Sequence, residues 1–457
     1  MVDAVIAYLP LVMMTSMCVL LFSGFPVAFV LAAVGLAFAL IGSVLGVFPT
    51  VALFNLPVRM YANFANNLVY PAVPMLLFMG VALERSGVAR ELLDCLSVVL
   101  RRLPGNLAIA VMVIGIILAP SAGLIGASVA TLSLIALPTM LGKGYRVPFA
   151  TGSVAAAGTL GLILPPSLML FFLADHLEVQ LGMLFMATVI PGFMLAGLFM
   201  AYMLARAASD PTLAPAAAAS TLTGAQFGVY VARSFALPVL LIVLVLGSIV
   251  AGLATPTQSG AVGAAGAVVL MALNGSLSFR LFHKILLATA MMTAMVFLIV
   301  MTATIFSYVF VYLDGTELVV DLVQGMGLGR WGTLSFVMGL IFVLGFFVDW
   351  IEITIIFLPI LYPALHALDF SDYLGAPGLS MLWIAVLLSL NLQSSFLTPP
   401  FGFALFFLKG TAPPGVRLEA IYRGVAPFVV LQILGLLVVV ALPALALWLP
   451  VRLFGLP

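Results

Sequence analysis

Charged residues are scarce in this sequence. Only 7% of the 457 residues are Asp, Glu, Lys or Arg, against about 25% in soluble domains. Hydrophobic residues make up 65% of the chain, and the mean hydropathy is +1.34. The formal net charge is only +1, so we expect neither nucleic acid nor an acidic partner. This composition excludes an ordinary soluble domain and predicts an all-α polytopic protein embedded in a lipid bilayer.

The residues that most enzymes rely on are also few. The three histidines form no H-E-x-x-H metal motif, and no Walker A lysine motif occurs. The two cysteines, Cys18 and Cys95, fall in a predicted helix and a helical connector, so we do not expect a disulfide framework. We therefore expect no enzyme activity and no resident cofactor.

Long apolar runs recur along the chain, each long enough to cross about 30 Å of hydrocarbon. Two further stretches, 105–141 and 331–366, are interrupted near the middle by small or polar residues and are interpreted as re-entrant hairpins. The segments 43–67 and 91–103 are amphipathic and are expected to lie along the membrane surface. The predicted crossings are 4–22, 26–47, 67–83, 147–176, 181–205, 234–252, 256–273, 286–313, 380–408 and 425–448, of which 147–176 and 380–408 are broken.

The basic residues divide unevenly between the two sides of this arrangement. Thirteen of the 16 fall on one side, and only Arg59, Arg330 and Arg452 fall on the other. The positive-inside rule assigns the first side to the cytoplasm. Both termini are then expected to face the periplasm, and the stretch ASDPTLAPAAAAST (208–221) is expected to be a cytoplasmic linker.

The linker divides the chain into two halves that resemble one another at a nearly constant offset. We assign 1–206 to an N-terminal repeat, 207–224 to the linker and 225–457 to a C-terminal repeat. Each half holds five crossings and one hairpin, and an odd number of crossings inverts the second half in the bilayer. Four pairs, 221 to 234 residues apart, carry the comparison: Pro26 and Pro256, Gly87 and Gly315, Pro138 and Pro359, and Pro165 and Pro399.

Adjacent prolines interrupt one crossing in each half, at Pro165–Pro166 and at Pro399–Pro400. A proline inside a helix removes a hydrogen bond and costs roughly 3 kcal/mol, and in lipid the freed carbonyls find no water. A kink packed against a neighbouring helix is the alternative explanation. Two such breaks at matching places favour instead exposed backbone near the middle of the membrane. There the half-helix N-termini suit an anion and the unwound carbonyls suit Na⁺.

The two hairpin tips are unusual for apolar segments. APSAGLIGASVATL (119–132) offers Ser121, Ser128 and Thr131, with carbonyls near Gly126, as hard oxygen ligands. The alternative is close helix packing by small residues.

The second tip, GFFVDWIEITIIFLP (345–359), holds Asp349 and Glu352, which are predicted to share one helical face far from either membrane surface. Buried carboxylates in a membrane indicate a functional site. The alternative is a wetter tip in which one carboxylate only caps a helix.

These segments together resemble the large membrane subunit of TRAP (tripartite ATP-independent periplasmic) transporters, the DctM-type protein. The resemblance rests on GASVATLSLIALPTMLGKGYRVPFATGSVAAAGTLGLILPPS (126–167), ATPTQSGAVGA (254–264), GFFVDWIEITIIFLPILYP (345–363) and LTPPFGFALFFLKG (397–410). They occur in the family's order over nearly the whole chain. The branch associated with 2-oxo acids, lactate and mannitol or chloroaromatic compounds is the most similar one.

The resemblance implies a Na⁺-coupled importer of an organic acid in the bacterial inner membrane, working as an elevator. The acid would be a C4-dicarboxylate, a 2-oxo acid, lactate or a related carboxylate. A periplasmic DctP-type binding protein would deliver it, and a small DctQ-type membrane subunit would support the large one. No small subunit precedes the first crossing here, so a separate one is expected.

Family sodium sites would map onto two groups of residues. The first comprises Gly126, Ser128, Pro165, Pro166 and Ser167; the second comprises Asp349, Thr398, Pro399 and Pro400. Substrate contacts are assigned to Ser121, Thr131, Glu352 and Gly402.

One position departs from the family, because Gln258 stands where Glu is frequent. A carboxylate role at that position is therefore not expected in this chain. Two rival functions stay open on the sequence: a stand-alone Na⁺/divalent-anion symporter, and an anion channel built from the same broken helices.

Overall fold

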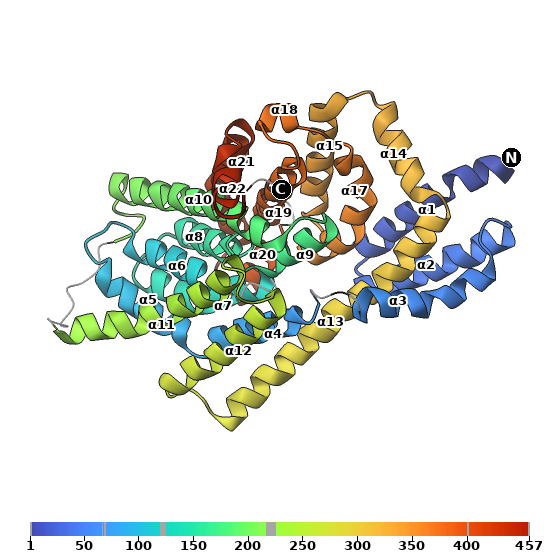
Figure 1. Ribbon diagram of the computed structural model, residues 1–457. Helices are drawn as coiled ribbons and strands as arrows, with labels where there is room; N and C mark the ends of the chain where they lie inside the picture. The colour runs from blue at the N-terminus through green and yellow to red at the C-terminus, as the bar shows by residue number, and fades with distance from the viewer. Residues whose placement is uncertain are drawn as a thin grey trace.

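A computed structural model describes residues 2–65, 67, 70–118, 125–215, 225–399 and 402–455, and within these ranges it contains helices and no strand. We divide the helices into two groups, which we call the frame and the body, and most of their members are labelled in Figure 1. The frame consists of α1 (Val2–Phe22), α2 (Val27–Val44), η1 (Thr50–Asn55), α3 (Leu56–Ala65), α4 (Ala72–Arg85), α5 (Val88–Val99), α11 (Ala225–Val250), α12 (Pro256–Leu273), α13 (Phe279–Tyr312) and α14 (Gly315–Gly325).

The body holds the two predicted hairpins and both broken helices. It consists of α6 (Asn106–Ile117), α7 (Ile125–Gly142), α8 (Val147–Leu160), α9 (Leu168–His176), α10 (Leu181–Ser209), α15 (Gly329–Leu344), α16 (Trp350–Glu352), the π-helical turn η3 (Ile353–Phe357), α17 (Leu358–His366), α18 (Ser371–Leu374), α19 (Ser380–Leu397), α20 (Phe403–Thr411), α21 (Leu418–Ala441) and α22 (Ala444–Phe454).

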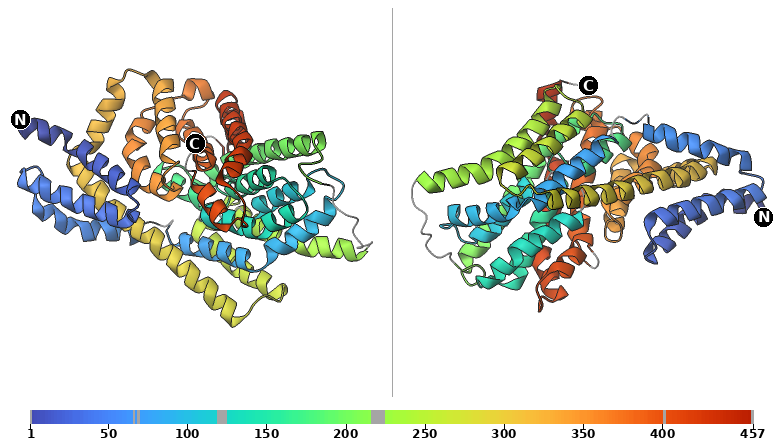
Figure 2. Two further views of the ribbon diagram at one scale, coloured as in Figure 1. Left: turned by 180° about the vertical axis from the view of Figure 1, so that it is seen from behind. Right: turned by 90° about the horizontal axis from the view of Figure 1, so that it is seen from below.

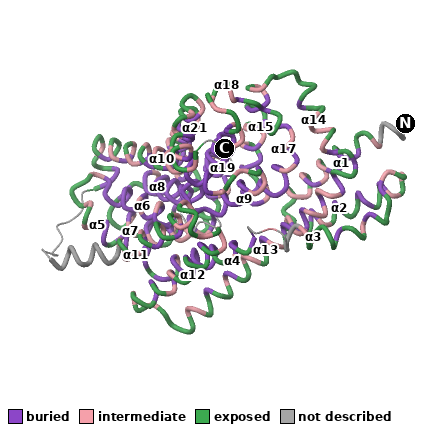
Figure 3. The backbone as a smooth tube through the Cα atoms, in the orientation of Figure 1, coloured by how far each residue is buried: buried purple, intermediate pink, exposed green. Residues whose placement is uncertain are grey.

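Burial varies within each group, since α4 of the frame is mostly buried and α21 of the body leaves apolar side chains exposed, but the extremes differ. In the body, α8, α9 and α19 are almost completely buried, whereas α2, α12 and α13 of the frame leave large apolar side chains exposed (Figure 3). Phe29, Val44 and Phe279 are examples. Apolar side chains that protein does not cover are stable when lipid or another membrane subunit covers them. Exposure on the frame is therefore what a bilayer protein requires.

The long helix α13 connects the parts of the frame, since it packs against α2, α3 and α4 (Figure 2). The two halves of the sequence also interlock there: α2 packs on α13, while α12 packs on α4. Left-handed residues stand at matching places, Gly87 (φ +85°) before α5 and Asp314 (φ +62°) before α14. The pair aligned in sequence, Gly87 with Gly315, is therefore displaced by one residue in the structure.

Seven described helices are long and apolar enough to cross a membrane, and α4 with α5, bent by 55°, would make an eighth. The other apolar helices are shorter. The predicted last crossing, 425–448, corresponds to the apolar helix α21, but its predicted end is wrong, because α21 ends at Ala441 and α22 begins at Ala444. Pro443 stands directly before α22 and has no N–H to continue the α21 hydrogen-bond ladder.

The two predicted surface connectors have different outcomes. The segment 43–67 contains η1 and α3, and α3 packs on α13. Its predicted place along the membrane surface stays a prediction. In the segment 91–103, the apolar side of α5, including Leu92 and Leu96, is buried, and α5 packs against α6 and α11. Protein rather than the membrane surface therefore covers that side. The linker is described only as far as residue 215; positions 216–224 lie outside the described residues.

Candidate ion and substrate site at the broken helices

The first break separates α8 from α9, as the proline pair predicts. The α8 helix ends at Leu160, and residues 161–167 form a buried, non-helical connection that contains a cis Pro165–Pro166 peptide. The Ser167 hydroxyl donates a hydrogen bond to the Leu162 carbonyl oxygen at 2.7 Å. Burial of the connection in protein satisfies the condition for interrupting a helix at membrane depth.

The second break separates α19 from α20. The α19 helix ends at Leu397, and Thr398 is extended (φ −87°, ψ 124°). The Thr398 hydroxyl donates to the Ser394 carbonyl oxygen at 2.8 Å. Gly402, directly before α20, has a φ of +49°, which favours glycine. Pro399 lies in the described turn, whereas Pro400 lies outside the described residues.

The first hairpin tip lies against elements of both repeats. Val129 of α7 packs on Gly158 near the end of α8, and Gly126 lies against the ring of Phe407 in α20. The Ser128 side chain is buried, and its Oγ has no hydrogen-bond partner among the described residues. Such an oxygen has its acceptor lone pairs available for a ligand. Ser121 lies outside the described residues.

The second hairpin tip has the same double attachment. Gly345, at the end of α15, lies against Ser395 of α19, three residues before Thr398. Trp350 packs on Phe172 of α9, with ring centroids 5.8 Å apart. The tip of each hairpin therefore contacts the broken helix of its own half and the short helix that follows the break in the other half.

The two carboxylates of this tip do not share a regular helical face. Asp349 precedes α16, and its Oδ1 accepts a hydrogen bond from the Trp350 backbone N–H at 2.8 Å. The predicted alternative, a carboxylate that caps a helix, therefore describes its local geometry. Glu352 ends α16, and its Oε2 is buried without a hydrogen-bond partner among the described residues. Burial makes both carboxylates costly unless a cation, a proton or further hydrogen bonds neutralise them.

Thr131 is engaged elsewhere. Its hydroxyl donates to a carboxylate oxygen of Glu84 in α4, so this residue joins the body to the frame. This contact could not be predicted from the sequence, because the two residues are 47 positions apart in helices whose orientation only the fold defines.

The arrangement provides oxygen ligands without a nearby cation. Both Ser167 and Thr398 donate their hydroxyl protons to carbonyls, which orients the oxygen lone pairs but does not use them. No Lys or Arg occurs in the described parts of the two breaks or of the two tips. Hard oxygen donors in irregular backbone suit an alkali cation better than a soft metal.

Sequence reasoning found the breaks and the tips but missed their cross-packing. Phe172 and Phe407, which contact the tip of the opposite half, were indistinguishable in sequence from the other phenylalanines. The only available signal was their position within two turns after each proline pair.

Comparison with known proteins identifies the family of the chain. The family model of the "Tripartite ATP-independent periplasmic transporter, DctM component" matches residues 14–445. The chain belongs to the DctM family. The resemblance inferred from the sequence motifs is thereby confirmed, and a DctM protein is a transporter permease rather than a member of an enzyme class.

The names of relatives of this DctM chain agree with this family assignment. It is 29% identical to the C4-dicarboxylate TRAP transporter large permease protein DctM of Pseudomonas aeruginosa over 382 residues, covering 83% of this chain and 85% of that one. It is 25% identical to the sialic acid TRAP transporter large permease protein SiaM of Vibrio cholerae over 439 residues, covering 95% and 97%. An isethionate TRAP transporter permease protein, DctMQ of Oleidesulfovibrio alaskensis, is 27% identical over 422 residues, covering 91% of this chain and 63% of that protein.

A solved structure shares the fold. The YdaH transporter of Alcanivorax borkumensis, described as having an unusual topology, superposes with a TM-score of 0.59 at 16% identity and covers 89% of this chain and 90% of its own. At this identity the likeness concerns the fold alone.

Proposed function

We propose that this DctM chain is the large subunit of a Na⁺-coupled TRAP transporter that imports an organic acid across the bacterial inner membrane. The observation that carries the proposal is the pair of cross-packed tips and breaks in the body. Buried and half-buried hydroxyl oxygens lie there beside irregular backbone, and the described parts of the tips and breaks contain no Lys or Arg. An anion and a cation bound together would each offset the desolvation cost of the other.

Na⁺ is assigned to the two groups of oxygens. Ser128 with the connection around Pro165, Pro166 and Ser167 forms the first proposed site. Asp349 with Thr398 and Pro399 forms the second, to which Pro400 would contribute from outside the described residues. A carboxylate, a hydroxyl and backbone carbonyls are ligands that hard cations prefer.

The substrate is placed beside the bound Na⁺, near Glu352 and Gly402. The helix N-termini after each break carry roughly half a positive charge, which would complement a carboxylate, since the described parts of the site hold no basic side chain. The names of the relatives specify C4-dicarboxylate, sialic acid, isethionate and 2,3-diketo-L-gulonate. All of these substrates are organic anions, and we propose that the substrate of this chain belongs to the same class.

An inverted repeat with elevator movement is part of the proposal. The reciprocal packing of α2 on α13 and α12 on α4, together with the left-handed residues before α5 and α14, supports a repeat that pairs elements of the two halves. The exposed apolar side chains of α2, α12 and α13, set against the buried helices α8, α9 and α19, support a frame in contact with lipid and a body that moves against it. Each hairpin would then enter and leave the membrane on one side.

Two partners are proposed. A DctP-type periplasmic binding protein would deliver the acid, and a DctQ-type small membrane subunit would cover part of the apolar surface of the frame. The relative named DctMQ supports a close association of the two membrane components.

The decisive experiment is uptake into proteoliposomes that contain this chain, the small subunit and the binding protein. Radiolabelled succinate, pyruvate and lactate serve as probes. We expect one of them to accumulate only when an inward Na⁺ gradient and the binding protein are both present, and K⁺ in place of Na⁺ is the matched control. Equal uptake without the binding protein would identify a stand-alone symporter, and non-saturating flux without a Na⁺ gradient would identify a channel.

A further inference from the structure

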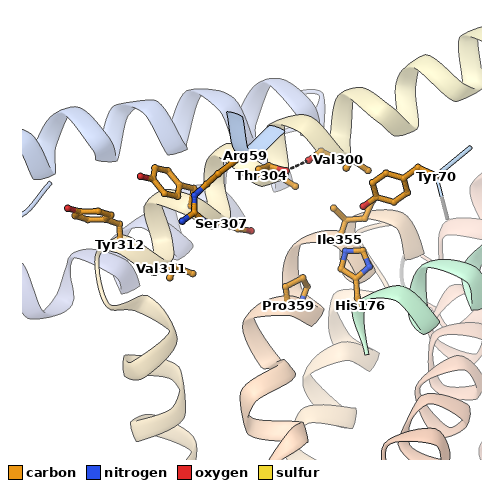
Figure 4. A pocket seen from close by; sticks show the side chains of 12 residues that line it. Arg59, Tyr70, His176, Val300, Thr304, Ser307, Val311, Tyr312, Ile355 and Pro359 are labelled. Carbon is orange, nitrogen blue, oxygen red and sulfur yellow. Dashed lines mark hydrogen bonds between the residues drawn. The ribbon is translucent and has the colours of Figure 1, made fainter. Parts of the chain in front are cut away.

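A cavity of about 390 Å³ lies between the frame and the body. Its frame side is formed by Arg59 of α3 with Ser307 of α13, and its body side by His176 of α9 and Pro359 of α17 (Figure 4). Tyr308 of α13 also lines it. This volume is within the range of about 300–1,000 Å³ that is usual for small-molecule sites. None of the residues assigned above to Na⁺ or substrate lines it.

Arg59 is the cation of this cavity. Among the described residues no carboxylate lies within salt-bridge distance of Arg59. Its guanidinium carbon stands 4.6 Å from the centroid of the Tyr308 ring, and the Tyr308 hydroxyl donates to the Ala52 carbonyl oxygen at 3.2 Å. Stacking uses the flat face of a guanidinium and leaves its N–H edges for a planar acceptor, which a carboxylate matches with two parallel hydrogen bonds.

The rest of the cavity lining combines polar side-chain atoms with apolar side chains. His176 Nδ1 lies 2.9 Å from the Phe172 carbonyl oxygen. Because a carbonyl only accepts, Nδ1 carries the proton of this bond, and Nε2 is the nitrogen left for another partner. Val300 and Ile355 provide apolar walls. One cation, a few polar atoms and apolar walls are suited to a small organic anion.

The other two basic residues assigned to the same membrane side differ from Arg59. Arg330 donates to both carboxylate oxygens of Asp372, at 2.5 and 2.7 Å, and these bonds lower the pKa of Asp372, so the pair remains ionised. Arg452 is exposed on α22 and does not line the cavity. An available positive charge and a cavity therefore coincide at Arg59.

We propose that this cavity is an outer receiving site, in which the N–H edge of Arg59 binds the carboxylate of the acid before it reaches the hairpin tips. The inference rests on the proposed function for its ligand and on the predicted topology for its side. A site between frame and body would hold an incoming anion where movement of the body can bring the tips to it. The tips themselves then need no basic side chain.

The charge of the cavity can be tested without transport. We would place a reporter thiol by Ser307→Cys in a Cys18→Ala/Cys95→Ala background, in nanodiscs of phosphatidylcholine with the small subunit bound. The thiol is alkylated by iodoacetate, itself a small carboxylate, and by neutral iodoacetamide. Any change in the pKa of the thiol affects both reactions alike, so the ratio of the two rates reports attraction of the carboxylate.

We expect Arg59→Gln to lower the iodoacetate-to-iodoacetamide ratio about five-fold, as removal of one nearby, partly screened charge requires. Arg59→Lys should retain most of the ratio, and the matched control Arg452→Gln should leave it unchanged. Succinate should slow alkylation by both reagents when Arg59 is present. A ratio that does not respond to Arg59→Gln would overturn the proposal.

Lipid phosphate has a chemistry similar to that of a carboxylate, so a second arm adds phosphatidylglycerol to the nanodiscs. If phosphatidylglycerol lowers the iodoacetate-to-iodoacetamide ratio to its value in Arg59→Gln and removes the effect of succinate, the cavity holds a lipid headgroup and the receiving-site proposal fails. In the uptake assay, Arg59→Gln should raise KM several-fold with little change in kcat. Absence of Na⁺-driven uptake with an intact ratio would refute the proposed function alone, and an unresponsive ratio with normal uptake would refute the receiving site alone.

Discussion

Asp349 occupies a position where one carboxylate can serve both structure and ion binding. Its Oδ1 accepts a hydrogen bond from the Trp350 N–H, and the residue is 7% exposed. Only one of its oxygens is used by this bond, so the second remains available to a cation. A simple cap and an ion ligand therefore differ in whether the negative charge itself is required.

Replacing Asp349 by Asn separates these two roles. Asn caps helices about as well as Asp, so the purified protein should fold normally, while the proposed second Na⁺ site loses its charge. We expect the Na⁺ concentration for half-maximal uptake to rise about ten-fold or more, because one charged ligand contact is worth roughly 1.5–3 kcal/mol. Binding of the acid by the separate binding protein should not change.

Asp369→Asn is the matched control. The Asp369 Oδ1 also accepts a backbone N–H, that of Ser371 at 2.8 Å, but in a loop outside both proposed ion sites. Its replacement should leave the Na⁺ titration unaltered. Equal titrations for wild type and Asp349→Asn would reduce Asp349 to a helix cap.

Ser128 tests the first ion site in the same way. The Ser128→Ala variant removes a buried oxygen that has no described hydrogen-bond partner, so no internal bond is lost. We expect a rise of several-fold in the Na⁺ needed for half-maximal uptake, measured in proteoliposomes. Ser133→Ala on the same helix removes a similarly buried hydroxyl and should have no such effect. A shift of equal size in both variants would indicate altered packing of α7 instead.

At the scale of elements, glycine allows helices of the two halves to approach closely. Gly152 of α8 and Gly424 of α21 lie so near that a methyl group on Gly152 would overlap the Gly424 carbonyl. Backbone atoms cannot move aside as a flexible side chain can, so Gly152→Ala should separate the helices at a cost of about 1–3 kcal/mol. We expect a lower midpoint of thermal unfolding in detergent.

The control for this variant is Gly197→Ala in α10, where no atom lies within 4 Å of the added methyl group. Alanine is favoured over glycine in a helix by about 0.5–1 kcal/mol, so this change should leave the midpoint equal or higher. Opposite signs for the two substitutions would establish the close packing of α8 on α21. A midpoint unaffected by Gly152→Ala would contradict it.

The same scale shows what sequence could predict. Adjacent prolines located both breaks because two consecutive residues without N–H groups cannot be absorbed by one kink. Single prolines were less informative, since Pro191 lies inside the continuous α10 whereas Pro443 marks the unpredicted break before α22.

The π turn η3 was also unpredicted. Leu358 N–H bonds to the Ile353 carbonyl there, five residues back, and Pro359 follows without an N–H. Nothing in the local sequence indicates that the helix forms hydrogen bonds five residues back at this point rather than bending at Pro359.

The features of the candidate site that could not be predicted from the sequence depend on contacts between residues far apart in the chain. Periodicity indicates which side of a helix is apolar, but not which helix covers it. The cavity at Arg59 requires residues 59, 176, 304–312 and 355–359 to meet, and only the arrangement of frame and body brings them together. Ser128, Asp349 and Glu352, in contrast, stand out as polar residues within apolar segments, so the sequence alone was enough to select them as candidates, and their roles stay predictions.

For the whole molecule, the distribution of basic residues predicts the orientation on which the outer receiving site depends. Thirteen of 16 basic residues fall on the side assigned to the cytoplasm. Ala208, exposed in the last turn of α10, is expected on that side, and Gln324, exposed in α14, is expected on the opposite one. Single cysteines at these positions, in the background without Cys18 and Cys95, therefore form a matched pair.

We expect a membrane-impermeant maleimide to label Gln324→Cys in intact spheroplasts and to label Ala208→Cys only after the membrane is opened. Both variants should react equally in detergent, which controls for intrinsic reactivity. The reverse pattern would place Arg59 and its cavity on the cytoplasmic side, where a periplasmic binding protein cannot deliver substrate. Labelling of both positions from one side would refute an odd number of crossings between them, and with it the inverted arrangement of the two halves.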